Sequence, residues 1–287
     1  RVAERVPDRR LRIAGDPGRG VEGRGGGQRA RVEPRGEALA EAVASLGGVH
    51  VAPAVGDEDP SDPLTGRRSR IDVVIDEAGR AGMHEFRGRR VIALDDMPLA
   101  VPAIRELGLF DEETPWRHLW KPGERVRAVA PSTGAPIIVI GQDSYAADGT
   151  RIDVDTVRWD VPVAGTLESY DVRPSGFWQT HVRGAQVLAN AVVAGAFGAD
   201  KSGVGRAVME LYSGAGLFSV PLARAVGETG RVVTLEGEEG AVRDAGENLA
   251  AFHWVDAFAG NVDREGVVDL AGQLGAVPDV VVADPPR

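Results

Sequence analysis

Hydrophobic and polar residues alternate over short stretches in the first half of the chain. Residues 71–75 read Ile-Asp-Val-Val-Ile, and a turn at 76–79 leads into a second apolar stretch at 82–86. This order predicts a β-hairpin. Other short apolar stretches predict further strands at 90–94, 125–130, 137–141 and 154–161. We therefore expect a small antiparallel α+β domain over residues 61–175.

The spacing of hydrophobic residues along the chain changes from Gly176 onward. Residues 182–197 are rich in alanine and valine and predict a long helix. Apolar strands then alternate with amphipathic helices, and the strands are expected at 207–212, 231–237, 255–260 and 279–284. Such alternation is typical of a parallel sheet that helices cover on both faces. We predict an α/β fold over residues 176–287, with a Rossmann-like doubly wound sheet.

The first 60 residues follow neither pattern. Residues 1–36 are rich in arginine and glycine and hold few large apolar side chains, so no packed core is expected there. Three interpretations stay open: an RNA-binding tail, a poorly ordered leader, and out-of-frame translation of GC-rich DNA. Residues 37–46 predict one short amphipathic helix, and residues 47–60 predict a linker.

Composition narrows the class of protein. The 287 residues are 43% hydrophobic and 26% charged, as expected for a soluble globular protein. They include no cysteine, which excludes disulfides, cysteine-ligated metals and a thiol nucleophile within this stretch. No apolar run is long enough to span a membrane and no signal segment is apparent, so we expect a cytoplasmic protein. Because the chain begins at Arg1 and ends directly after a strand-like run, we interpret it as a fragment of a longer protein.

The net charge of −10 does not indicate a nucleic-acid-binding protein. RNA contacts would have to come from local arginine clusters, which are found at Arg67, Arg68 and Arg70 and at Arg87, Arg89 and Arg90. The acidic last third of the chain would suit a cationic small molecule. Four tryptophans could stack on RNA bases, but we expect them to pack in the core: Trp116, Trp120, Trp178 and Trp254.

Candidate chemistry lies at the ends of the predicted parallel strands. The first strand runs into Glu210-Leu-Tyr-Ser-Gly-Ala-Gly216, where Gly214 and Gly216 allow a sharp turn and a close approach of a ligand to the backbone. A plain turn stays an alternative. The second strand ends at Glu236, about 20 residues later, where a carboxylate can accept both hydroxyls of a ribose. A solvated strand-end acid is the other interpretation of Glu236.

The next two strand ends continue the pattern. Asn261 and Asp263 follow the third strand and could bond an adenine amino group, although an ordinary loop would look the same. The fourth strand ends in Asp284-Pro-Pro-Arg287, a rigid extended turn that could form the wall of a ligand crevice. Four such elements in this order form the pattern of a class I S-adenosylmethionine methyltransferase.

Together with the segment Phe177-Trp-Gln179, these motifs make residues 60–287 resemble the RNA uracil-C5 methyltransferases that act on tRNA and 23S rRNA. The resemblance implies S-adenosyl-L-methionine as cofactor, tRNA or rRNA as partner, and methyl transfer to carbon 5 of a uridine. Beside Gly214 and Gly216, it implies cofactor contacts at Gln179, Tyr212, Leu217, Glu236, Asn261 and Asp284. Leu217 stands where many members have Asn, so only its main chain could contribute. RNA contacts are expected at Arg67, Arg68 and Arg70.

The resemblance also implies what the chain lacks. The nucleophilic cysteine and the catalytic base of the family lie beyond the Asp-Pro-Pro-Arg motif, so no catalytic residue is expected here and this piece should be inactive by itself. Met97 stands where the family has a cysteine of an iron–sulfur cluster, so neither a cluster nor another metal is expected.

Three other functions stay open. An RNA cytosine-C5 methyltransferase shares the fold and the thiolate chemistry. A non-catalytic RNA-binding protein could have kept the methyltransferase fold. A nicotinamide dehydrogenase would need a third glycine where Ser219 stands, and is disfavoured.

Overall fold

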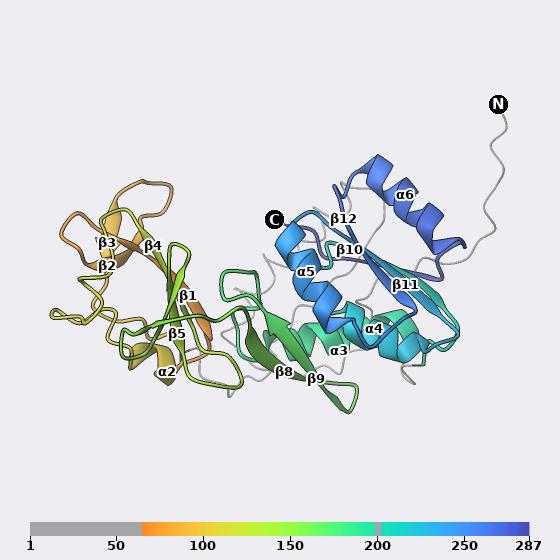
Figure 1. Ribbon diagram of the computed structural model, residues 1–287, viewed down its shortest axis with the longest axis horizontal. Helices are drawn as coiled ribbons and strands as arrows, with labels where there is room; N and C mark the ends of the chain where they lie inside the picture. The colour runs from red at the N-terminus through yellow and green to blue at the C-terminus, as the bar shows by residue number, and fades with distance from the viewer. Residues whose placement is uncertain (1–64, 199–201, 287) are drawn as a thin grey trace, which may run out of the picture.

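The computed structural model describes residues 65–198 and 202–286, so the expectations for residues 1–60 lie outside the described residues. An antiparallel sheet lies at one end of the molecule and a parallel sheet with its helices at the other (Figure 1). A two-stranded hairpin and an irregular connection lie between them.

The antiparallel sheet has seven strands in the order β3-β2-β1-β4-β5-β6-β7. Their bounds are β1 Arg70–Ile75, β2 Ala81–His84, β3 Val91–Ala93, β4 Arg125–Val129, β5 Ile137–Ile140, β6 Asp143–Ala146 and β7 Arg151–Ile152. The predicted hairpin is confirmed, since Val74 pairs with Gly82 and Ile75 with Ala81. Alternate residues of β1 are buried in a core beneath the sheet, which also includes Ile104 of the one-turn helix α2 (Pro102–Arg105).

The parallel sheet has the order β12-β11-β10-β13, so the chain moves outward in one direction and then crosses to the other side of its first strand. The bounds of its strands are β10 Ala207–Leu211, β11 Arg231–Glu236, β12 Val255–Ala259 and β13 Val280–Ala283. The helices are α3 Gly184–Phe197, α4 Ser219–Val226, α5 Glu239–Asn248 and α6 Arg264–Leu274. Each predicted strand and helix of this half is present, with ends that shift by at most a few residues.

Helices cover both faces of the parallel sheet. In Figure 1, α6 lies above the sheet while α3 and α4 lie below it. Residues of alternate positions along the strands enter different cores: Val208 and Val232 pack on the side of α3 and α4, and Met209 and Val233 pack against α6. The prediction of a doubly wound α/β sheet preceded by an antiparallel domain is therefore confirmed.

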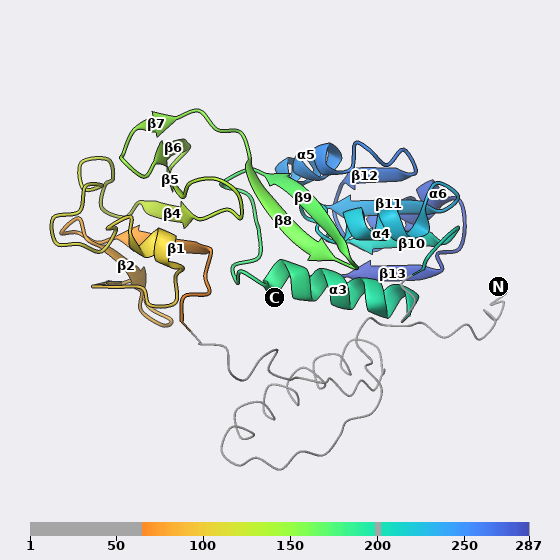
Figure 2. The same cartoon turned by 90° about the horizontal axis from the view of Figure 1, so that it is seen from below.

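The hairpin of β8 (Val157–Val163) and β9 (Thr166–Val172) forms its own two-stranded sheet. Its inward residues, among them Trp159 and Tyr170, belong to the same core as α3 and α4. Figure 2 shows the hairpin beside α3. The division of the chain at residue 175 stays a prediction, and this packing groups the hairpin with the parallel sheet.

Of the four tryptophans singled out in the sequence, Trp116, Trp120 and Trp178 are buried to 5% exposure or less, and Trp254 is half-buried against the same core as the hairpin. Three of these indole nitrogens donate to backbone carbonyls: Trp116 to Leu107 at 2.6 Å, Trp120 to Gly79 at 3.1 Å and Trp254 to Ala223 at 2.9 Å. The expectation of core packing is confirmed. Within the described ranges, no helix is long and apolar enough to cross a membrane.

The two halves are joined by backbone hydrogen bonds. Ser69 donates to the carbonyl of Thr180 at 2.9 Å, and Val182 donates to the carbonyl of Arg67 at 2.9 Å. The end of the chain that follows β13 lies between the two sheets in both views (Figures 1 and 2). The carboxyl edge of the parallel sheet is therefore turned toward the antiparallel domain.

Candidate functional site

The loop between β10 and α4 is a tight turn at the carboxyl edge of the sheet. Gly214 and Gly216 have φ values of 56° and 90°, which residues with a side chain rarely adopt. Tyr212, with φ of 61°, has a backbone conformation in the same region, which is strained for a residue other than glycine. The sequence prediction of a sharp turn at these glycines is confirmed, and the strained Tyr212 adds to it.

Glu236 at the end of β11 is tied directly to this loop. Its Oε2 accepts from the backbone nitrogen of Gly214 at 3.0 Å, and its Oε1 accepts from the nitrogen of Glu238 at 2.9 Å. Each carboxylate oxygen has two lone pairs, so both oxygens can accept one more donor from a ligand. Two residues that the sequence placed at neighbouring strand ends thus form one unit.

Two side chains that sequence analysis did not single out support the loop through hydrogen bonds to its backbone carbonyls. Asn248 of α5 donates to the carbonyl of Ala215 at 3.0 Å, and the Tyr170 hydroxyl donates to the carbonyl of Leu217 at 3.0 Å. Leu217 itself is 8% exposed and packs in the core. Its carbonyl is engaged by Tyr170, which leaves its nitrogen as the main-chain group that could serve a ligand.

Glu210 is a buried carboxyl next to this site, with an exposed fraction of 0%. Its Oε2 accepts from the Ser219 hydroxyl at 2.7 Å, and its Oε1 has no partner among the described residues. Burial first, and then the charges of Asp284 and Glu236, raises the pKa of Glu210 to about 8. Thr234, whose hydroxyl also lacks a described partner, is its neighbour in the strand register. Three carboxyl groups therefore converge at the carboxyl edge.

Asn261 lines a cavity of about 340 Å³ beyond β12, together with Leu235 and Gly260. Asp263 caps α6 instead, because its carboxylate accepts from the nitrogen of Gly266 at 2.9 Å. Its role there is structural, which leaves Asn261 as the free polar side chain of this loop. Among the described residues, no side-chain hydrogen bond joins Asn261 to the Glu236 unit; both follow adjacent parallel strands at the same edge.

Gln179 lies in a different place. It lines a cavity of about 300 Å³ with Trp159, Trp178 and His181, where the connection meets the β8–β9 hairpin. The residues that line the Asn261 cavity are not among its walls. The structure does not group Gln179 with the other predicted cofactor residues.

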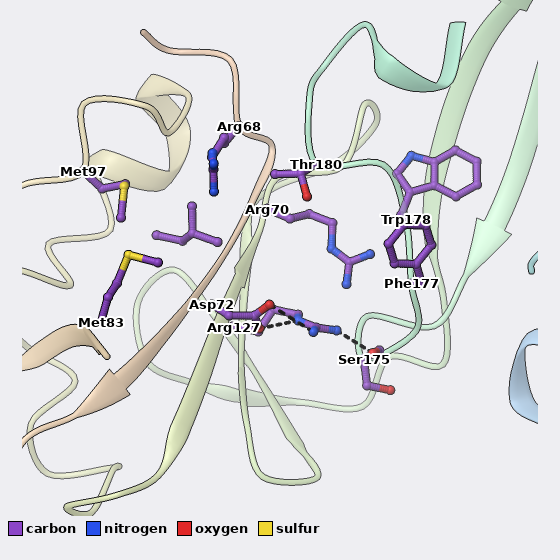
Figure 3. Close-up of a pocket in the computed structure, with 11 residues that line it drawn as sticks. Arg68, Arg70, Asp72, Met83, Met97, Arg127, Ser175, Phe177, Trp178 and Thr180 are labelled. Carbon is purple, nitrogen blue, oxygen red and sulfur yellow. Dashed lines mark hydrogen bonds and ion pairs between the residues drawn. The ribbon is translucent and has the colours of Figure 1, made fainter. Parts of the chain in front are cut away.

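A cavity of about 370 Å³ lies between the antiparallel sheet and the connection (Figure 3). Arg70 points toward Phe177 and Arg127 toward Ser175 on one side of β1, and Met83 and Met97 lie on the other. Arg127 pairs with Asp72 through Nε at 2.8 Å and also donates to the carbonyl of Ser175. Phe177 is 73% exposed. The cavity therefore combines guanidinium groups with an exposed aromatic ring.

The predicted RNA-binding arginines differ from one another. Arg68 is exposed and lines this cavity, and Arg67 is half-buried. Arg70 is only 7% exposed and donates to the carbonyl of Gly176 at 2.6 Å. Burial and the neighbouring Arg127 lower its pKa to about 10. Arg70 thus holds the connection and presents little charge to solvent.

No cluster of three or more histidine, cysteine, aspartate or glutamate side chains in the described part of the chain could hold a metal ion.

No family model matches the chain. It is 33% identical over 259 residues to an uncharacterized RNA methyltransferase of Bifidobacterium longum. The matched region covers 87% of this chain and 58% of that protein. It is 41% identical over 85 residues to the 23S rRNA (uracil(1939)-C(5))-methyltransferase RlmD of Acinetobacter baylyi, or 29% of this chain and 18% of that one. The chain thus spans less than two thirds of the curated relatives that it matches over most of its length.

Among solved structures, the chain is similar to the Thermus thermophilus 16S rRNA N2 G1207 methyltransferase in complex with AdoMet and guanosine. The TM-score is 0.37 and the identity 22%, over 56% of this chain and 40% of that one. The fold assignment rests on the strand order and helix placement described above.

Proposed function

Because the chain is homologous to bacterial RNA methyltransferases over most of its length, we propose that it binds S-adenosylmethionine and RNA. The proposed reaction is methyl transfer to carbon 5 of a uridine in rRNA or tRNA. The observation that carries the proposal is the bond between Glu236 and the nitrogen of Gly214. It joins a ribose-type carboxylate to a loop whose backbone a ligand can approach closely.

The charges at this edge fit a cationic cofactor. Burial first, and then the charges of Asp284 and Glu236, raise the pKa of Glu210, so the edge is acidic. S-adenosylmethionine carries a sulfonium and an ammonium group, and the carboxylates of this edge would attract both cations. The Oε1 of Glu210, which has no partner among the described residues, is the kind of buried acceptor that a positively charged ligand or a bridging water satisfies.

Five of the predicted residues have a binding task in this proposal. The free lone pairs of Glu236 accept the ribose hydroxyls, and Asn261 offers its amide to the adenine in the cavity beyond β12. Tyr212, Gly214 and Gly216 shape the loop so that its backbone can approach the amino-acid part of the cofactor. The bound cofactor supplies an electrophilic methyl group, and the protein orients it.

RNA would enter from the side of the antiparallel domain. The cavity with Arg68, Arg127 and Phe177 has the charge for a phosphate and an exposed ring for a base. The uridine specificity is supported by the 85-residue similarity to an enzyme named for uracil carbon 5.

The chemistry proposed for the uracil needs a thiolate that adds to carbon 6 and a base that removes the proton from carbon 5. The 287 residues hold no cysteine, so we propose that they bind cofactor and RNA but transfer no methyl group by themselves. A non-catalytic RNA-binding protein that kept this fold is the second candidate, and the same absence of cysteine favours it.

Titration calorimetry with S-adenosylmethionine, its demethylated product and NAD tests the cofactor. We expect binding of the first two, and about a tenfold or greater loss in Glu236→Ala, because hydrogen bonds to a charged group contribute about 1.5–3 kcal/mol. Glu239→Ala, an exposed acid in the first turn of α5, serves as the control. Equal affinity in Glu236→Ala, or preference for NAD, would contradict the proposal.

A transfer assay with labelled cofactor and rRNA fragments tests the second part. The chain should transfer no label. Cofactor binding without transfer fits the proposed methyltransferase piece, whereas RNA binding without any cofactor binding would favour the non-catalytic alternative.

A further inference from the structure

The hairpin that joins β2 to β3 ends in an exposed tip, residues 84–90, with the sequence His-Glu-Phe-Arg-Gly-Arg-Arg. The tip is a well-formed turn, since the nitrogen of Gly88 donates to the carbonyl of Glu85 at 3.0 Å and the nitrogen of Glu85 donates to that of Arg90 at 2.9 Å. β3 is the outermost strand, so this hairpin forms one edge of the seven-stranded sheet.

The tip exposes an aromatic ring and stacks a guanidinium on it. Phe86 is 88% exposed, and the guanidinium carbon of Arg87 lies 5.0 Å from its ring centroid. A single exposed apolar side chain needs no explanation. An exposed ring covered by a guanidinium is different, because both planar groups can stack on a nucleobase.

The charge of the tip is opposite to that of the chain. Three arginines minus one glutamate leave a local charge of +2, against −10 for all 287 residues. Glu85 pairs with Arg90 at 3.0 Å. Among the described residues, neither Arg87 nor Arg89 has an ion pair, so two guanidinium groups remain for an anionic partner.

Backbone strain singles out Arg87. It occupies the third position of the Glu85–Gly88 turn with φ of 58°, where turns of this kind favour glycine or asparagine. Residues held in such a conformation cluster at ligand-binding and other functional sites. Ala164, another non-glycine residue with positive φ, is accounted for by the ordinary hairpin turn that it forms with Gly165.

The tip also lies near the cavity of Figure 3. Met83, which lines that cavity, is three residues before Phe86. Three residues of extended chain span roughly 10 Å. A strand of RNA with one base in the cavity would therefore pass within reach of the tip.

We propose that residues 84–90 form a contact surface for single-stranded RNA, in which Phe86 stacks on a base and Arg87 and Arg89 bind phosphates. This inference rests on the proposed function, because it names the surface that holds the RNA outside the cavity.

The test uses the 287-residue chain and a labelled oligouridine of about 12 nucleotides, a length within the site sizes of single-strand binders, with anisotropy measured at several salt concentrations. Phe86→Ala should weaken binding roughly tenfold, as expected for one lost base stack. Leu167→Ala is the matched control, since Leu167 is 62% exposed at the tip of the β8–β9 hairpin.

Arg87→Gly combined with Arg89→Ala removes both guanidinium groups and relieves the strain at residue 87. The slope of log affinity against log salt should become shallower by about 1.4, because each phosphate contact on a single strand contributes about 0.7. Thermal unfolding should show no loss of stability in this variant. Arg264→Ala, an exposed arginine at the start of α6, should leave the slope unchanged.

Duplex RNA of matched length provides a second arm. Stacking needs an unpaired base, so the loss in Phe86→Ala should disappear with the duplex. If wild type binds the oligouridine and the tip variants bind it equally well, the tip inference is wrong while the proposed function stands. If wild type binds cofactor but no oligouridine, the tip inference is also overturned, and the calorimetry above reports separately on the cofactor site.

Discussion

The carboxyl edge of the parallel sheet, where we propose that the cofactor binds and which we call the cofactor edge, differs in construction from the cavity beside the antiparallel sheet. At the cofactor edge, residues follow one another at successive strand ends, and the groups that would touch a ligand are a backbone turn and carboxylates. In the other cavity, side chains come from β1, β2, β4, the connection and the loops beside them, and five of the eleven lining residues are arginines or aromatic. One site is acidic and lies at successive ends of adjacent parallel strands, and the other is basic and is formed by packing between distant segments.

The comparison is tested most strongly by two neighbouring arginines. Arg70→Ala should lower the free energy of unfolding by about 2–3 kcal/mol, because a charged donor to the buried carbonyl of Gly176 is lost. Arg68→Ala, at an exposed position, should change it by less than about 0.5 kcal/mol. Urea unfolding measures both values. Equal effects would show that the basic cavity does not depend on packing in the way described.

The buried carboxyl of the cofactor edge predicts a dependence on pH. The pKa of Glu210 is raised to about 8 in the fold, so the folded state keeps its proton at pH values where the unfolded chain has released it. The contribution of the Glu210 proton to the free energy of unfolding is therefore fully present below about pH 4.5, the ordinary pKa of glutamate. This contribution is lost as the pH rises toward 8. The loss is at most about 1.4 kcal/mol per pH unit.

Unfolding at pH 5.5 and 6.5 measures this dependence. Glu210→Gln should reduce it, because an amide does not titrate. Asp269→Asn, at an exposed position of α6, should leave the dependence as in wild type. An unchanged pH dependence in Glu210→Gln would mean that other groups determine it.

Support of the glycine loop by the hairpin gives a smaller effect. Tyr170→Phe removes the hydroxyl that donates to the carbonyl of Leu217 and should cost about 1 kcal/mol of stability. It should also weaken cofactor binding, because the loop loses a support. Tyr145→Phe, on the half-buried strand β6, is the control for loss of a hydroxyl. If Tyr170→Phe left both stability and cofactor affinity intact, the loop would be held by Glu236 and Asn248 alone.

The smallest expected change concerns the charge of the cavity. Arg68→Ala should make the salt dependence of RNA binding shallower by about 0.7, which corresponds to one phosphate contact. Cofactor affinity should stay the same, since Arg68 lines a cavity that does not include the glycine loop. Arg206→Ala, exposed at the opposite end of β10, should leave the salt dependence as it is. Filter binding at several salt concentrations distinguishes the two.

Sequence patterns predicted the parallel half well because its strands are covered on both faces. Such strands are continuous apolar runs, and the glycines and acids that follow them mark where they end. β9 had no such signal. Glu168 occupies one of its buried positions and is satisfied there by Arg224 of α4, at 2.5 Å and 2.8 Å. An ion pair between residues 56 positions apart cannot be inferred from local alternation.

The sequence by itself determined the order of strands and helices in the parallel half, the glycine turn, and the acid that follows the second strand. These features depend on burial and backbone geometry within a few residues. The tertiary structure decided that Glu236 binds the nitrogen of Gly214, that Gln179 lines another cavity, and that Arg70 is buried while Arg68 is exposed. Those outcomes depend on which distant segments pack together, because a charged side chain has the same local sequence signal whether it meets water or a backbone carbonyl.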